Sequence, residues 1–395
     1  MVKQLIDIHD SEARLRRAER RLHNPLSEKN KTLIFEFEKQ LFSEGLSKRR
    51  VEKYLDIVRK LGEMLGKDFD EAGKKDIEDL VYKIERSDYS PWTKHDYKVA
   101  LKRFYRWLKG NNEEYPEEVK WIKTTLKAKD ELMPGELIKE EEIMRLVEVC
   151  DNPRDKAFIM TLYESGARIG ELGSMRIKDV VFEENYAKLM LTGKTGPRRI
   201  IVVASVPYIH SWLESHPFKN NLDAPLWINI GTVNRYKPMS YPALAKILKV
   251  AAKKAGLTKK VHPHKLRHSR ATFLASKLTE AQMNQVFGWR QGSKMPSIYV
   301  HLSGRDLDDA ILGVYGLKKI TEEKPKLTPK ICPRCQMSNQ VDAKFCSRCG
   351  LALDVKAAQE LEEARLKTDS IMDLLMKDKE FRELLMRKMR EYGFS

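Results

Sequence analysis

Four of the five cysteines stand in two close pairs near the C-terminus, with the spacing C-x2-C-x10-C-x2-C. Two such pairs can present four thiolates as a tetrahedron to one Zn²⁺ ion, and the glycine after the last cysteine suits the tight turn involved. Two redox dithiols are the alternative, but no thioredoxin-like strand and helix surround either pair. The expected ligands of this Zn²⁺ are Cys332, Cys335, Cys346 and Cys349.

The cysteine module covers only residues 331–352 and is too short to fold around its own core. A chain of this length generally requires a staple such as a metal ion. Four protein ligands would close the coordination sphere, so we expect a structural ion and not a catalytic one. The pattern resembles a zinc ribbon. Cys150 stands alone and is expected to be a buried core residue.

A second set of chemically capable residues lies in the middle of the chain. It consists of the motifs ARIGEL (167–172), HKLRHS (264–269) and YVH (299–301), with Lys194 in a glycine-rich turn and Trp289 between them. A guanidinium group binds two phosphate oxygens at once and stays charged, and an imidazole transfers protons near neutral pH. An activated hydroxyl with such neighbours can open a phosphodiester.

These five elements, in this order and with this spacing, resemble the tyrosine recombinase (phage integrase) family, whose members include integrases and Xer proteins. The resemblance covers about residues 135–317 and, more loosely, the helical segment before them. It implies that the nucleophile is Tyr299, which attacks phosphorus to give a 3′-phosphotyrosine and a free 5′ hydroxyl. Because this link stores the energy of the broken bond, rejoining needs no cofactor. The implied catalytic residues are Arg168, Lys194, His264, Arg267, Trp289 and Tyr299.

The resemblance gives each of these residues a role. Arg168 and Arg267 would bind the phosphate oxygens, and His264 would take or give a proton near the attacking oxygen. Lys194 would protonate the 5′ leaving oxygen. Trp289 would stabilise the phosphate or pack against the site, because an indole N–H donates a hydrogen bond but cannot shuttle a proton.

The sequence departs from the family pattern near the tyrosine. Trp289 stands where histidine is more frequent, and the gap from Trp289 to Tyr299 is one residue longer than usual and contains Pro296. These departures put the local path of the chain in question. Tyr315 is the rival nucleophile, but it lacks the following histidine that Tyr299 has in His301.

Ordinary structural explanations remain open for several of these residues. An Arg-x-Gly-Glu sequence on a helix commonly forms a surface ion pair, a lysine in a glycine-rich turn is commonly solvated, and a tryptophan can belong to the core. Glu171, one helical turn after Arg168, is expected to hold an active-site cation in place. We interpret His268 and Tyr163 as structural.

The elements that must position these residues fall into several domains, as 395 residues suggest. Apolar residues at helical spacing predict an all-α, SAM-like N-terminal domain, and alternating helical patterns with a short hairpin predict a mixed α/β catalytic domain. A charged segment with an apolar stripe ends the chain as a helix that could pair with a copy of itself or pack on the ribbon. The expected parts are a charged arm or solvated helix (1–24), a helical core DNA-binding domain (25–126), a linker (127–135), the catalytic domain (136–318), a second linker (319–330), the zinc ribbon (331–352) and the C-terminal helix (355–392).

The net charge of the chain indicates what kind of partner it binds. A formal net charge of +17 and a pI near 9.4 suit a polyanion, most often nucleic acid, although composition does not separate DNA from RNA or an acidic membrane surface. No stretch approaches the apolar length of a membrane helix, and the N-terminus lacks an apolar signal core. We therefore expect a cytoplasmic, DNA-associated protein without membrane contacts.

The family resemblance implies two protomers on each double-stranded recombination site and a tetramer at synapsis. An integrase that inserts or excises a mobile element is the favoured role, and an Xer-like chromosome dimer resolvase is the alternative. A type IB topoisomerase and a non-catalytic DNA-binding regulator remain competitors from other classes.

Overall fold

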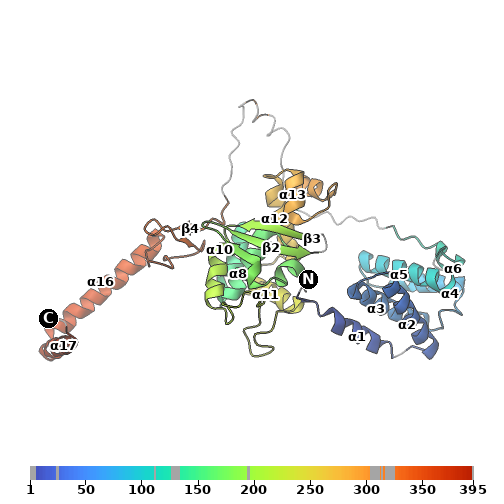
Figure 1. Ribbon diagram of the computed structural model, residues 1–395, viewed down its shortest axis with the longest axis horizontal. Coiled ribbons are helices and arrows are strands. Elements are labelled where there is room, and N and C mark those ends of the chain that lie inside the picture. The colour runs from blue at the N-terminus through green and yellow to red at the C-terminus, as the bar shows by residue number, and fades with distance from the viewer. Residues whose placement is uncertain are drawn as a thin grey trace. The chain divides into compact units, whose positions relative to one another are not determined.

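The computed structural model describes residues 6–23, 26–110, 113–125, 134–193, 196–302, 312, 315 and 325–393. The chain divides into an N-terminal unit, His9–Glu131, and a C-terminal unit, which combines Leu132–Ser395 with Met1–Ile8 (Figure 1). Lys194 lies outside the described residues, and so does most of the segment 303–324.

The N-terminal unit is a bundle of helices, which confirms its predicted class. The helix after Ser27 begins with a side-chain cap, because the Ser27 hydroxyl accepts a hydrogen bond from the backbone N–H of Asn30. Ser90 caps a later helix in the same way, by accepting from the backbone N–H of Thr93. Aromatic rings fill the centre, where Phe37 and Phe104 meet edge to face with centroids 5.1 Å apart. The helices are α1 (Ser11–Arg21), α2 (Glu28–Ser43), α3 (Lys48–Leu65), α4 (Lys74–Arg86), α5 (Pro91–Lys109) and α6 (Glu117–Lys120).

Helix α1 differs from the solvated segment expected at the start of the chain. Leu15, Ala18 and Leu22 recur at helical spacing, and all three are buried in the core of the N-terminal unit, where α1 packs on α3. The many charged residues between them hide this short stripe in the sequence. Its arginine side chains remain at the surface.

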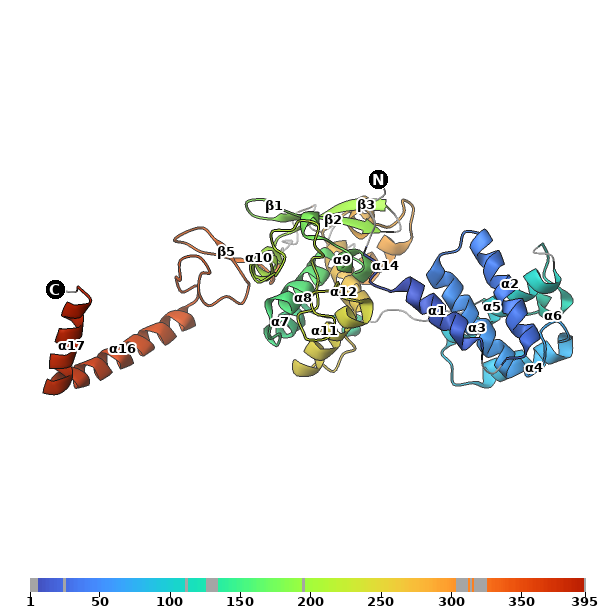
Figure 2. The same cartoon turned by 60° about the horizontal axis from the view of Figure 1, so that its bottom comes forward.

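The C-terminal unit combines helices with a three-stranded antiparallel sheet in the order β1-β2-β3 (Figure 2), which confirms the predicted mixed α/β class. The predicted hairpin is present, and its strands pair as far as Gly193 and Gly196, the residues that flank Lys194 in the sequence. The third strand was not predicted, because it has only three residues. The strands are β1 (Val180–Phe182), β2 (Ala187–Gly193) and β3 (Gly196–Val202).

The helices of this unit surround α8, whose residues are mostly buried. The predicted helical stretches are found with somewhat different ends, and α10 was missed in the apolar run after the hairpin. The helices are α7 (Glu140–Glu148), α8 (Pro153–Ser165), α9 (Ile169–Gly173), α10 (Val206–Glu214), α11 (Tyr241–Lys254), α12 (Pro263–Ala275), α13 (Glu280–Phe287) and α14 (Met295–Leu302).

Two separate hydrophobic cores stabilise the C-terminal unit. The large core includes α8, the sheet, α10 and α11, and Cys150 lies half-buried at its edge. The small core is formed by α12, α13 and α14. Helix α12 belongs to both, because Leu266 is buried in the large core while later residues of the helix point into the small one. The small core contains Ala271, Ala275, Met283, Phe287 and Tyr299.

The cysteine module contains a short two-stranded sheet, in which β4 (Lys330–Ile331) pairs with β5 (Ser338–Asn339), and it contacts the rest of the C-terminal unit directly. Leu327 is buried in the large core. The Tyr208 hydroxyl donates a 2.7 Å hydrogen bond to Asp342, and the Lys156 ammonium lies 4.0 Å from the same carboxylate. The module is therefore packed on the unit that precedes it.

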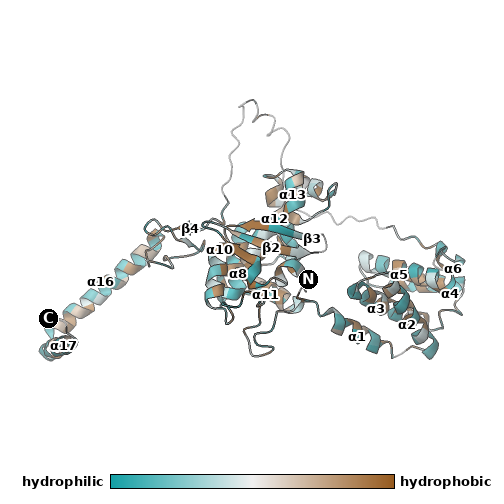
Figure 3. Ribbon diagram, in the orientation of Figure 1, coloured by the Kyte–Doolittle hydropathy of each residue, from teal (hydrophilic) through white to brown (hydrophobic). Residues whose placement is uncertain are grey.

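The C-terminal segment forms two helices, α16 (Val355–Lys377) and α17 (Lys379–Glu391), where a single helix was expected. The chain leaves helical geometry at Asp378, whose side chain caps α17 by accepting from the N–H of Phe381. Hydrophobic residues stand among hydrophilic ones along α16 (Figure 3), and Leu361, Ile371 and Leu375 are exposed. Within the described residues, no helix combines the length and apolar character needed to cross a membrane.

Candidate active site

Arg168 lies at the start of α9, directly after the turn that ends α8. The backbone N–H of Arg168 donates to the Glu171 carboxylate at 2.9 Å, and its guanidinium binds the same carboxylate at 3.0 Å. The turn uses Gly166 in the left-handed region at φ 57°, where a side chain would collide with the Phe287 ring. About a third of the Arg168 side chain stays exposed, so its remaining donors can reach a bound anion.

Glu171 also binds a second arginine, Arg198 on β3. Two N–H···O bonds of 2.8 and 2.7 Å join the two side chains in a bidentate pair. Burial raises the pKa of the Glu171 carboxyl, but Arg198 and then Arg168 outweigh burial and hold this pKa below its usual range. Glu171 therefore holds two cationic side chains in place.

Arg198 was missed in the sequence, although strand alternation carries a signal for it. Positions 198, 200 and 202 share one face of β3, and Ile200 and Val202 are buried. A charged residue on an inward face needs a partner, which Glu171 provides. The same carboxylate approaches the end of β2, since a Cβ on Gly193 would lie 2.3 Å from it. The Arg198–Glu171 pair thus fixes the base of the hairpin that carries Lys194.

Arg267 on α12 connects the ends of two helices. Its guanidinium donates to the carbonyl of Gly166, after α8, and to the carbonyl of Phe287, at the end of α13, both at 2.7 Å. The negative ends of helix dipoles favour a cation there. Burial, followed by the charge of Arg168, lowers the pKa of Arg267 to about 10, so the group remains protonated at neutral pH.

His264 lies in the first turn of α12, where its side chain reaches solvent while part of its ring is covered by the protein. Burial of its ring lowers the pKa of His264 below 6.5, and the charges of Arg267 and Arg168 lower it further. His264 therefore lies close enough to both candidate phosphate-binding arginines for their charges to lower its pKa. A neutral imidazole beside two guanidinium groups can accept or donate a proton near a bound phosphate.

Tyr299 lies on α14 with only 1 % of its surface exposed. The Trp289 indole stacks parallel to the Tyr299 ring at 5.4 Å, and Phe287 stacks on Trp289 at 4.8 Å. The hydroxyl of Tyr299 forms a 2.5 Å hydrogen bond with Nδ1 of His268. Burial raises the pKa of Tyr299 to about 12, although the Arg267 charge acts in the opposite direction.

The structure thus gathers five of the six expected catalytic residues in one region, where Arg267 also stacks over Trp289 at 5.6 Å. The sixth, Lys194, is outside the described residues. The rival Tyr315 is 75 % exposed. His268, interpreted as structural in the sequence, is the residue that contacts the Tyr299 hydroxyl. Its position four residues after His264 on one helix was the available signal.

The sequence is also similar to those of known proteins. Residues 136–305 match the phage integrase family and form a domain of this family. It is 27 % identical over 288 residues to tyrosine recombinase XerA of Pyrococcus horikoshii, covering 71 % of this chain and 93 % of that protein. It is 24 % identical to tyrosine recombinase XerD of Bifidobacterium longum over 66 % of this chain and 87 % of that one.

Solved structures share the fold. The XerH site-specific recombinase bound to a palindromic difH substrate matches with a TM-score of 0.53 at 18 % identity, over 78 % of this chain and 97 % of that one. A lambda integrase dimer bound to a COC′ core site matches with a TM-score of 0.54 at 15 % identity, over 70 % of this chain and 78 % of that one.

The four cysteines form a compact cluster that can bind a metal ion. Their sulfur atoms all lie within 4.8 Å of one another. The Cys332–Cys349 and Cys335–Cys346 sulfur pairs are 3.6 and 3.5 Å apart, near the edge of about 3.8 Å expected for a tetrahedron with Zn–S bonds of about 2.3 Å. Burial raises the pKa of the Cys346 thiol, but backbone N–H donors lower it overall to about 6. The donor set therefore fits Zn²⁺.

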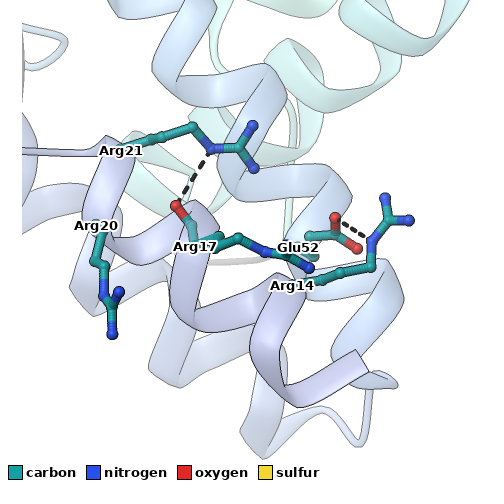
Figure 4. A pocket seen from close by; sticks show the side chains of 5 residues that line it. All are labelled: Arg14, Arg17, Arg20, Arg21 and Glu52. Carbon is teal, nitrogen blue, oxygen red and sulfur yellow. Dashed lines mark hydrogen bonds and ion pairs between the residues drawn. The ribbon is translucent and has the colours of Figure 1, made fainter. Parts of the chain in front are cut away.

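A surface pocket of the N-terminal unit gathers positive charge. Its volume is about 540 Å³, and it is lined by four arginines of α1 and by Glu52 of α3 (Figure 4). Arg14 binds Glu52 at 2.9 Å, and Arg17 and Arg21 keep half or more of their side chains exposed. Four guanidinium groups with one carboxylate among them leave an excess of positive charge for an anion.

Proposed function

We propose that this protein is a site-specific recombinase that cleaves and rejoins DNA through a phosphodiester link to Tyr299. The observation that carries the proposal is the group formed by Tyr299, Trp289 and Arg267, with Arg168 and His264 beside it. Guanidinium groups around a phenol provide the nucleophile and the anion-binding groups that phosphoryl transfer needs.

The reaction follows from the chemistry of these groups. Arg168 and Arg267 bind the non-bridging oxygens of the scissile phosphate. The Tyr299 oxygen bonds to phosphorus as the bond to the 5′ oxygen breaks, and Lys194 protonates that oxygen. A 5′ hydroxyl from the partner strand then attacks the phosphotyrosine and releases Tyr299. One phosphodiester replaces another, so the cycle consumes no cofactor.

We propose double-stranded DNA as the partner of both units. The XerH structure contains a difH substrate, and another lambda integrase structure is described as a tetramer bound to a Holliday junction. Two protomers on each site and a tetramer at synapsis are the corresponding assembly for this chain. The arginine pocket on α1 supports phosphate contacts by the N-terminal unit.

We propose a structural Zn²⁺ ion in the cysteine cluster, held by Cys332, Cys335, Cys346 and Cys349. The sulfur spacing and the lack of disulfides among these residues support it. Metal analysis of the purified protein should give one zinc per chain, and Cys346→Ser should abolish it. A full zinc content in that variant would contradict the assignment.

Integration or excision of a mobile element is the biological role that we favour, because a zinc ribbon and tail appended to the catalytic domain suit such an element. Chromosome dimer resolution is the second candidate, supported by the similarity to proteins named XerA and XerD. Recombination of plasmids that carry either the flanks of the gene or chromosomal candidate sites separates the two roles.

Covalent trapping tests the chemistry first. The purified protein is incubated, without divalent metal, with nicked duplexes tiled from the DNA that flanks its gene, and SDS-resistant adducts are measured. The wild type and Tyr315→Phe should form the adduct at one tile, and Tyr299→Phe should not. An adduct that survives in Tyr299→Phe would refute the nucleophile. Tight binding without any adduct would favour a DNA-binding regulator, and relaxation of a plasmid without a site would favour a topoisomerase.

A further inference from the structure

The hydroxyl of Tyr299 needs a group that removes its proton during attack, and the residue in contact with it is His268. Nδ1 of His268 lies 2.5 Å from the Tyr299 oxygen, and the two rings are inclined by 30° with centroids 5.8 Å apart. His264 is exposed on the preceding turn of α12, next to the arginines. Two histidines on one helix therefore face different parts of the reaction.

Solvent reaches His268 but not Tyr299. His268 lines a cavity of about 550 Å³, and Tyr299 does not. A histidine can accept a proton at one ring nitrogen and release another from the second. His268 thus contacts the buried hydroxyl and also borders a space that water can enter. The cavity is lined by Gly135, Glu136, Thr258, Lys259, Lys260, His262, Lys265 and His268.

The charges around His268 keep its imidazole neutral before DNA arrives. Burial lowers the pKa of His268 to about 4, and the neighbouring His264 and Arg267 side chains lower it further by disfavouring a second positive charge. On the cavity side, Lys265 binds Glu136 at 3.1 Å, and Lys259 and Lys260 add positive charge. A neutral imidazole whose Nε2 carries the hydrogen has a free lone pair on Nδ1, so it can accept from the phenol. A bound phosphate adds negative charge nearby and thereby favours the protonated imidazole.

We infer that His268 is the proton acceptor of Tyr299 in DNA cleavage and the proton donor to it in rejoining. This inference rests on the proposed function. As the Tyr299 oxygen bonds to phosphorus, its proton passes to Nδ1 of His268 and the bond to the 5′ oxygen breaks. That oxygen takes its proton from Lys194. The protonated His268 can release a proton from Nε2 to water in the cavity. The same steps run in reverse when the strand is rejoined. His268 is thus a catalytic residue, because it touches a reacting atom.

Single-turnover cleavage of a nicked duplex that loses its short 5′-hydroxyl fragment isolates this step. In His268→Asn an amide oxygen can still accept from Tyr299 but cannot hold the proton. We expect cleavage to slow by about 10²- to 10⁴-fold, the usual contribution of a general base. The rate of this variant should also rise with pH beyond the range in which the wild type has levelled off.

Three controls separate a proton acceptor from a structural residue. His262→Asn changes another histidine of the same cavity while keeping a good N-cap for α12, and it should cleave at close to the wild-type rate. Added imidazole should rescue His268→Ala, since the cavity leads to the vacated position. A substrate with sulfur in place of the 5′ bridging oxygen, whose thiolate leaves without a proton, should rescue Lys194→Ala but not His268→Asn.

The outcomes that overturn the inference are distinct from failure of the proposed function. If the wild type forms no adduct on any tile, the recombinase assignment itself fails. If the wild type cleaves and His268→Asn matches it, or exceeds it because His268 only restrains the tyrosine, His268 is not the acceptor. A slow variant with an unchanged pH profile and no imidazole rescue, at normal DNA binding, would assign His268 a structural role.

Discussion

The two sides of the active site are stabilised by different interactions. Arg168, Glu171 and Arg198 form a buried charge network that joins α9 to β3 beside the large core. Tyr299 belongs instead to the small core, where five residues of the described chain are fully buried. There the tyrosine is held by ring stacking and by one hydrogen bond to His268.

This difference indicates how the site divides its work. The phosphate-binding side has its geometry set in the free protein, because two arginines share one carboxylate of low pKa. The tyrosine side rests on ring stacking and a single hydrogen bond, so we expect it to open locally at a lower free-energy cost than the phosphate-binding side. We expect the phosphate-binding side to be rigid and the tyrosine side to be adjustable.

The largest effect is expected from Glu171→Ala. The substitution leaves Arg198 buried without its partner, which typically costs about 3–5 kcal/mol in the free energy of unfolding. Cleavage of nicked DNA should fall below detection, because Arg168 and the hairpin of Lys194 lose their common anchor. Denaturant unfolding measures the first effect and covalent trapping the second.

The matched control for this variant is Glu183→Ala, which removes a surface carboxylate paired with Lys188. Exposed pairs contribute about 0–1 kcal/mol, so this variant should be nearly as stable as the wild type. Equal losses in both variants would show that the charge network does not stabilise the phosphate-binding side.

Trp289→Ala tests the small core. Removing a stacked indole commonly costs about 3–5 kcal/mol, and we expect the lower end of this range because a small cluster can collapse around the vacancy. Trp289→Phe keeps the stack and should lose less. Hydrogen exchange should accelerate in α13 and α14 and stay unchanged in α9. Acceleration across both sides would contradict the division of the site.

Acid should weaken the tyrosine side before the phosphate-binding side. The folded pKa of His268 is lowered to about 4 from 6.5, so its stabilising contribution is present above pH 6.5 and is lost as the pH falls toward 4. The contribution of Glu171, whose pKa is also lowered, is complete above pH 4.5 and is lost only below that value. At pH 5, hydrogen exchange should be faster in α14 than at pH 7.5, by a loss of about 1–2 kcal/mol, with α9 unchanged. His268→Asn should remove this difference.

The smallest effect is expected from Asp342→Ala, at the contact between the cysteine module and the C-terminal unit. Loss of the hydrogen bond from Tyr208 should cost about 1 kcal/mol. Limited proteolysis should then release the module more readily, while cleavage activity is retained. A clear loss of cleavage activity in Asp342→Ala would show instead that the module supports the active site.

Contacts between residues of the same helix or hairpin could be predicted from the sequence, whereas contacts between residues of different elements could not. The fold class, the hairpin and the pairing of His264 with Arg267 on one helix follow from local spacing. The Arg198–Glu171 pair and the contact of His268 with Tyr299 join residues 27 and 31 positions apart. Their partners depend on the register of a strand and on the packing of helices, which local periodicity does not define. The burial of the α1 stripe was hidden in the same way.

The docking of the cysteine module makes the residues just before it part of the stability of the C-terminal unit. The backbone N–H of Lys326 donates to Glu140 at 2.8 Å, and Leu327 is buried in the large core. A chain shortened after α14 would therefore leave a gap in this core and would remove one donor from a carboxylate of α7. The catalytic helices expressed without the module should accordingly give a less stable protein.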